Sequence, residues 1–427
     1  MNAETSKKIP LLSPILQLFM VAMILANIAG NMYGPLLPLY LKSLGADVVQ
    51  IGLFFTLAQI IPLVLQILGG WISDSLGRLR SIALGSVAGM LSYVGLILAP
   101  TWQWVLVGQG LGAITGSLIG PSFGAFIAEE SAEENRARVY GITDSIFTIV
   151  TVVGPPLGGY LVDRFGFKFM LMIAAIIYSS ATFLRIAMAR RAAAHEAQKS
   201  NGSLNFKSLR MNLSAMLGLI MAGGLVTWVL VTDGIRDISF SFSGSLLPVY
   251  LDEIGALSAQ QIGWLASILG VANMLTNIPA GWLADKKGER LAIILGFLVQ
   301  ACALFIFMKA TSFWSFAVVW ATFGIGIGLM SPAYQSLISK VLPERLRGTG
   351  FGLIQSSLGL FSLPAPSIGA LLYKNISPIV PFMITAWASL LAIIPVWLKF
   401  KITPKDEAAN EVALEKLEAF GKATVAE

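Results

Sequence analysis

Apolar segments of 18 or more residues recur along this 427-residue chain, and they constrain its fold more than any other feature. A helix of that length can cross the hydrocarbon core of a bilayer. Only 12% of the residues are charged, about half the share in an ordinary soluble protein. The twelve expected spans are about 14–41, 51–71, 82–99, 103–128, 139–162, 169–189, 213–250, 261–283, 291–309, 313–339, 349–373 and 379–399. We therefore predict an all-α integral membrane protein.

The second half of the chain repeats the first. The segment Leu37-Pro38-Leu39-Tyr40-Leu41 returns as Leu247-Pro248-Val249-Tyr250-Leu251, an offset of 210 residues. Such internal repeats are typical of membrane transporters built from two similar halves. The predicted organisation is an N-terminal six-helix bundle (1–190), a polar linker (191–212), a C-terminal six-helix bundle (213–400) and a charged tail (401–427).

Basic residues are distributed unevenly between the two sides of the predicted bundles. Of the 29 Lys and Arg residues, 23 fall in the termini, at the helix ends or in the loops on the amino-terminal side. Arg236 lies within a span, and five face the other side: Lys42, Arg164, Lys168, Lys309 and Lys374. Basic loops mark the cytoplasmic side of a membrane protein. We therefore expect a multi-pass protein of the cell or inner membrane with both termini in the cytoplasm. The net charge of +6 therefore reflects topology and predicts no nucleic-acid partner.

A glycine-rich loop occurs once in each half. The first copy runs from Gly70 through Asp74 and Gly77 to Arg78, and the second runs from Gly281 through Asp285 to Gly288 and Glu289. Glycines let two helices turn back within a few residues, and an Asp can accept from N–H groups at a helix end. The loop resembles the signature between the second and third helices of the major facilitator superfamily. Glu289 departs from it, because that family has an arginine there.

The resemblance implies a twelve-helix transporter that works by alternating access around a site near the bilayer midplane. In that family an acidic residue at the end of the fourth helix bonds the loop arginine when the cytoplasmic side is closed. Here Arg78 with Glu129 or Glu130 would be the equivalent latch, together with Asp74. A solvated charged loop is the alternative interpretation of these residues. Breaking a latch of this kind should shift the population between inward and outward states.

The fifth span contains Gly154-Pro155-Pro156, followed by Gly158 and Gly159. This resembles a signature of the superfamily's antiporters, which implies export. The alternative is a packing kink, since prolines weaken a helix and glycines thin it. The resemblance is incomplete in the fourth span, where Gln109-Gly110 is preserved but Leu106 occupies the place of the proton-coupled exporters' arginine.

Three charged residues, Asp233, Arg236 and Asp237, interrupt the seventh span. Each costs about 2.5–3.5 kcal/mol at the centre of a membrane helix, so such groups pair with one another or line a wet cavity. Asp233 and Asp237 share a helix face, with Arg236 between them. The surplus acid could carry a proton or face a cation. A self-neutralising structural cluster, or a helix break that moves the charges toward the interface, is the alternative.

Further polar residues are candidates for the same cavity, although interhelical packing would also explain amides in lipid. Two pairs of asparagines four residues apart lie on single helix faces, and one acid lies near the cytoplasmic third of the fifth span. These candidates are Asn27, Asn31, Asn273, Asn277 and Asp144.

Nothing in the sequence suggests an enzyme. It contains neither a nucleophile–base pair nor a phosphate-binding loop, and we expect no cofactor and no metal. We predict a proton-coupled exporter of a small organic or drug-like compound, acting as a monomer in the bilayer. A proton-coupled uptake symporter for an organic anion, with Arg236 gripping the substrate's acid group, is the alternative. From another class, a non-transporting sensor could share the same fold.

Overall fold

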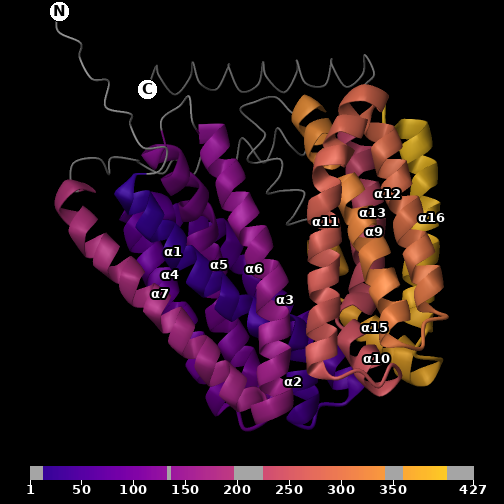
Figure 1. Cartoon of the computed structure of the whole chain (residues 1–427), viewed down its shortest axis with the longest axis horizontal. Helices are drawn as coiled ribbons and strands as arrows, with labels where there is room; N and C mark the ends of the chain where they lie inside the picture. The colour runs from indigo at the N-terminus through magenta and orange to yellow at the C-terminus, as the bar shows by residue number, and fades with distance from the viewer. Residues whose placement is uncertain (1–12, 132–135, 197–224, 342–358, 402–427) are drawn as a thin grey trace, which may run out of the picture. The chain divides into compact units, whose positions relative to one another are not determined.

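The computed structural model describes residues 13–131, 136–196, 225–341 and 359–401. Every regular element within these ranges is a helix, which confirms the predicted fold class (Figure 1). Eight helices in the described part of the chain are long and apolar enough to cross a membrane, and the shorter segment Val48–Leu63 is also apolar.

The helices of the first half follow the expected spans closely. They are α1 (Pro14–Tyr33), the 3-10 turn η1 (Gly34–Leu36), α2 (Leu37–Ser43), α3 (Val48–Leu76), α4 (Arg78–Leu98), α5 (Trp102–Glu130), α6 (Arg136–Phe165) and α7 (Phe167–Glu196). The turn between α3 and α4 uses Gly77 at φ 86°, in the left-handed region that the repeated loop predicted.

The second half shows the same order where it is described. Its helices are α9 (Leu225–Gly244), α10 (Leu247–Glu253), α11 (Ala259–Lys287), α12 (Glu289–Phe307), α13 (Phe313–Val341), α15 (Ala365–Asn375) and α16 (Val380–Lys399). Gly288 has a φ of 93° between α11 and α12 and matches Gly77. The expected spans 213–250 and 349–373 and the predicted linker 191–212 extend outside the described residues.

Both expected spans that contain the Leu-Pro repeat are divided. The first is broken by η1 after Tyr33, and the second is broken between Gly244 and Leu247. In each case the proline lies in the first turn of the short helix that follows. Proline has no N–H to donate to the preceding turn, so it suits the start of a new helix. Hydropathy did not reveal the break, because both sides of it are apolar.

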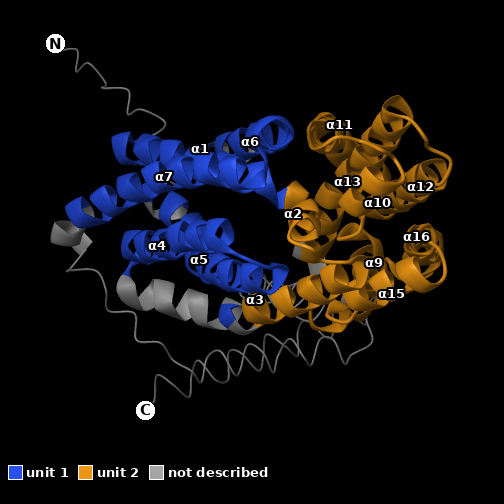
Figure 2. Cartoon of the chain, turned by 90° about the horizontal axis from the view of Figure 1, so that it is seen from below, with its two compact units in different colours: residues 1–34, 64–204 blue, residues 35–63, 205–427 orange. Residues whose placement is uncertain are grey.

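The chain forms two compact units, shown in different colours in Figure 2. Unit 1 comprises residues 1–34 and 64–204, and unit 2 comprises 35–63 and 205–427. Helix α2 and the first part of α3 therefore pack with the second half of the chain. The division into two sequence halves remains a prediction about the repeat.

Each unit contains a close helix contact made possible by one glycine. In unit 1, a Cβ on Gly158 of α6 would lie 2.0 Å from the carbonyl oxygen of Met32. In unit 2, a Cβ on Gly369 of α15 would lie 2.0 Å from the carbonyl oxygen of Phe242. Gly154 similarly faces Asn31. Two glycines of the antiporter-like motif, Gly154 and Gly158, thus allow close contact with the α1 backbone, and α6 continues through Pro155 and Pro156.

Candidate functional site

Unit 2 contains an open cavity of about 350 Å³ between α9, α12, α13 and α16. That volume lies at the lower end of the range typical of small-molecule sites. Residues from all four helices line it: Asp233, Arg236, Asp237, Phe240, Gln300, Phe323, Ile327, Met330, Ser331, Tyr334, Gln335, Ile338, Thr385 and Ser389. The three charged residues predicted from the seventh span thus lie together at one cavity.

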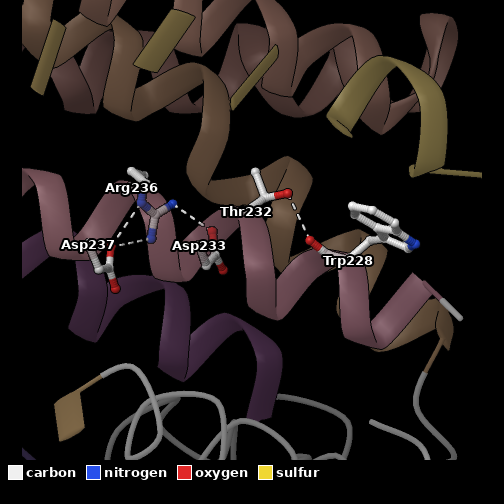
Figure 3. A network of polar contacts seen from close by, with 5 residues as sticks. All are labelled: Trp228, Thr232, Asp233, Arg236 and Asp237. Carbon is white, nitrogen blue, oxygen red and sulfur yellow. Dashed lines mark hydrogen bonds and ion pairs between the residues drawn. The ribbon is translucent and has the colours of Figure 1, made fainter. Parts of the chain in front are cut away.

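Arg236 is held between the two acids of its own helix (Figure 3). Its Nη1 lies 3.1 Å from Asp233 Oδ1. Its Nη2 and Nε donate to Asp237 Oδ1 at 2.8 Å and 2.9 Å. The three residues sit in the middle of the described helix α9, whose end at Gly244 lies beyond them.

The two acids differ in their exposure. The Asp233 side chain is 7% exposed and that of Asp237 is 35% exposed, so only Asp237 is open to a molecule entering the cavity. The face of Tyr334 lies 5.5 Å from the guanidinium carbon of Arg236, a cation–π contact that fixes the arginine from the α13 side. One cation against two carboxylates leaves the cluster with a formal charge of −1 when both acids are ionised.

Neutral hydrogen-bonding groups occupy the remaining polar positions of the cavity, and the sequence did not single them out as site residues. Thr385 of α16 donates to the Ser239 carbonyl of α9, and Ser389 donates to the Thr385 carbonyl. Gln300 of α12 is 7% exposed. A signal existed for Ser331 and Tyr334, because the segment Ser331-Pro332-Ala333-Tyr334 repeats Gly120-Pro121-Ser122-Phe123 at an offset of 211.

The four candidate asparagines do not line this cavity. Asn27 and Asn31 donate to the carbonyls of Met23 and Asn27, four residues earlier in their own helix. Asn273 faces α13, where its Oδ1 is buried beside Gly328. Asn277 is exposed. Their assignment to a transport site stays a prediction.

The structure describes only some of the residues predicted to form a cytoplasmic latch. The environments of Gly70, Asp74 and Glu129, and of the coupling candidate Asp144, lie outside what it describes, so their roles also stay predictions. Glu130 and Asp285 are described and exposed. In the second copy of the loop, Glu289 binds Lys340 and accepts a hydrogen bond from Ser336 at 2.8 Å. The residue that departs from the family signature therefore joins α12 to α13.

One buried cation in unit 1 was missed by the charge count, which placed Arg185 at a helix end. Helix α7 continues to Glu196, and Arg185 is 2% exposed within it. Its guanidinium donates to Ser86 Oγ at 2.9 Å and contacts Met23 Sδ at 2.8 Å. It thus connects α7 with α4 and α1 through neutral partners.

The helical fold and the charged cavity between apolar helices are the arrangement expected of a membrane transporter. A family model described as Major Facilitator Superfamily matches residues 19–233 and 234–424, so the chain belongs to this superfamily. The family inferred from the repeated loop is thereby confirmed. Membership of a transporter family is consistent with the expectation that the chain is not an enzyme.

Several curated relatives are named for resistance or efflux. The chain is 24% identical to "Multi-drug resistance efflux pump PmrA homolog" of Lactococcus lactis, over 80% of this chain and 84% of the relative. It is 26% identical to "Tetracycline resistance protein, class E" of Escherichia coli, over 82% and 80% respectively. A relative from Planococcus maritimus, "Na(+), Li(+), K(+)/H(+) antiporter", is 24% identical over 70% and 76%.

Solved structures support the fold alone. A bacterial homologue of the iron transporter ferroportin, in an inward-facing state, superposes with a TM-score of 0.74 at 15% identity, over 91% of this chain and 99% of that one. A POT family transporter in complex with 5-aminolevulinic acid gives a TM-score of 0.70 at 14% identity, over 91% and 96%.

Proposed function

We propose that this transporter exports a small organic compound in exchange for protons, and that the cavity of unit 2 is where the two compete. The observation that carries the proposal is the charge balance of α9. Arg236 is engaged by both acids and its side chain is 28% exposed, while Asp237 is the more exposed of the two acids, at 35% against 7% for Asp233. The cavity therefore offers an entering molecule the Asp237 carboxylate beside a guanidinium whose charge is already balanced by the two acids.

Competition at Asp237 would give exchange. A proton on Asp237 neutralises that carboxylate and leaves Asp233 and Arg236 as a neutral pair. A cationic or hydrogen-bonding compound would favour the ionised carboxylate, so its binding favours release of the proton. Since a ligand shifts a conformational equilibrium only by its differential affinity for the two states, proton and compound can drive opposite halves of an alternating-access cycle. The relatives named for drug efflux support this direction.

Uptake of an organic anion is the competing proposal. Arg236 already donates two hydrogen bonds to Asp237 and pairs with Asp233, so an anion would either share the guanidinium with these acids, beside their negative charge, or displace one of them. Displacement would leave a carboxylate without its cation in a membrane interior, which is costly. The pairing of Arg236 therefore favours a cationic or neutral compound over an anion as the ligand of this cavity.

The test is the pH gradient of everted vesicles, followed with a fluorescent probe while candidate drug-like compounds are added. We expect compounds to dissipate the gradient with the wild type and not with Asp237→Asn. The matched control is Asp163→Asn, which removes the same charge at an exposed position near the end of α6. Equal responses of Asp237→Asn and wild type would refute a role for this carboxylate. Stimulation of anion uptake, abolished by Arg236→Gln, would favour the symporter instead.

A further inference from the structure

The helices of unit 2 carry different charges at their two ends. One end comprises the start of α9 and α12 and the last turns of α11, α13 and α16. We call it the basic end. Its described charged residues are Lys286, Lys287, Arg290, Lys340, Lys399 and Lys401, against Asp285 and Glu289. Lys340 is paired with Glu289. The basic end therefore has a surplus of four positive charges.

The opposite end of unit 2 is neutral by comparison, because its basic residues are mostly paired. Lys42 lies 2.8 Å from Asp252 and 2.9 Å from Glu253. Lys374 lies 2.9 Å from Asp47. The surplus at the basic end is thus a local property of that end.

Three cations of the basic end lie against tryptophan rings. Arg290 lies 4.1 Å from the centre of the Trp397 ring, Lys286 lies 4.5 Å from that of Trp282, and Lys399 lies 5.3 Å from that of Trp228. Trp282 and Trp397 are 60% and 57% exposed, on helices that are long and apolar enough to cross a membrane. Tryptophan is enriched at the level of the lipid headgroups, where its ring meets both apolar and polar groups. A cation on such a ring is positioned without being neutralised.

Arg290 also has a hydrogen-bond donor without an acceptor. Its Nε is buried and has no acceptor among the residues that the structure describes. The carboxylate next to it in sequence, Glu289, is engaged by Lys340 and Ser336. A buried donor without an acceptor is destabilising unless something outside the described residues supplies one.

We propose that the basic end binds the headgroup of an anionic phospholipid, with Arg290 on Trp397 at the centre of the site. The phosphodiester oxygens accept from the Arg290 guanidinium, and the neighbouring lysines add long-range attraction. The exposed ring of Trp397 contacts the glycerol and the upper acyl chains. This occupant follows from the charge surplus, the exposed indoles and the apolar helices below them, since a soluble anion would use only the first of these. The site is separate from the cavity at Asp237 and does not depend on the direction of transport.

The experiment is a lipid titration of the purified full-length protein, with phosphatidylglycerol or phosphatidylcholine added in detergent and bound lipid counted by native mass spectrometry. We expect phosphatidylglycerol to bind preferentially. Arg290→Gln should weaken its binding about five-fold, the equivalent of about 1 kcal/mol for one basic residue at a membrane surface. Trp397→Leu should also weaken it, although it leaves the charge in place. Glycerol phosphate should not compete, which distinguishes a lipid from a free phosphate.

The control is Lys309→Gln, which removes an exposed cation just beyond the opposite end of α12. Its phosphatidylglycerol binding should equal that of the wild type. If Arg290→Gln does not fold, Lys399→Gln replaces it as the test of the same surface. Equal affinities for the two lipids, or equal losses in Arg290→Gln and Lys309→Gln, would overturn the proposal.

Discussion

Lys42 connects two segments that are far apart in the sequence, and its removal gives a quantitative test of the packing in unit 2. At the end of α2 its Nζ contacts Asp252 and Glu253 at the end of α10. The three side chains are between 34% and 40% exposed, so solvent screens them. Exposed ion pairs of this kind contribute about 0.2–1 kcal/mol each. Two pairs together therefore contribute about 0.4–2 kcal/mol to the packing of α2 on α10.

Lys42→Gln should raise the opening equilibrium of this contact by that amount, which corresponds to between about two-fold and about thirty-fold. The assay is hydrogen exchange of the α2 amides, Leu37–Ser43, in the purified protein. Lys42→Glu should open it further, because three carboxylates would then meet. The exchanged pair, Lys42→Asp with Asp252→Lys, should recover part of the protection.

Lys309→Gln is the control for charge removal at an exposed position. The reasoning would be refuted if Lys42→Glu exchanged no faster than wild type. It would also be refuted if the exchanged pair were no more protected than Lys42→Asp alone, since coupling between the two positions is the basis of the prediction.

Three further predictions concern other parts of the chain. The Gln50 backbone N–H, with Lys374, lowers the pKa of Asp47 below its ordinary value. The ionised Asp47 therefore stabilises the folded state at pH values above the unfolded-state pKa of about 3.9, and this stabilisation is lost as the pH falls through the lower folded-state pKa. Protection factors at the start of α3 should therefore stay constant from pH 7 to 5 and fall only below about pH 4, and Asp47→Asn should remove this dependence. Gly158→Ala should lower the stability of the folded protein by about 1–3 kcal/mol, as for overpacked sites, because the new Cβ meets a backbone oxygen. Gly116→Ala should leave it unchanged, because a Cβ there would have no atom within 4 Å, and equal melting temperatures of the two variants would contradict the packing argument. The orientation in the membrane can be tested by cysteine labelling in a Cys302→Ser background. Lys309→Cys should react with an impermeant maleimide in intact cells and Lys286→Cys should not, and the reverse pattern would contradict the predicted topology.

The charged cluster could be found from the sequence because Asp233, Arg236 and Asp237 are conspicuous in an apolar run. Their mutual pairing also follows from helical spacing. The hydroxyl groups that complete the cavity could not be found in this way. Thr385 resembles any other threonine of a membrane helix, and only the packing of α16 on α9 brings it to the Ser239 carbonyl.

Arg185 is a residue whose local sequence predicts the wrong environment. Two arginines follow it within six residues, so the sequence suggests a helix end with a basic border. Its burial depends on Ser86 and Met23, which come from two other helices. No local pattern encodes that meeting. The helix breaks before Pro38 and Pro248 could be predicted only in part, because the prolines are visible in the sequence but the hydropathy around them is uniform.

The ion pair between Lys42 and Asp252 joins residues that occupy equivalent positions in the two repeats, 210 apart. Two identical halves could not form it: whichever residue stood at this position would meet its own copy, as two lysines or as two carboxylates, and the contact would be repulsive. The attraction exists only because the halves have diverged while being joined in one chain. This position therefore favours the fused protein over a symmetric dimer of either half.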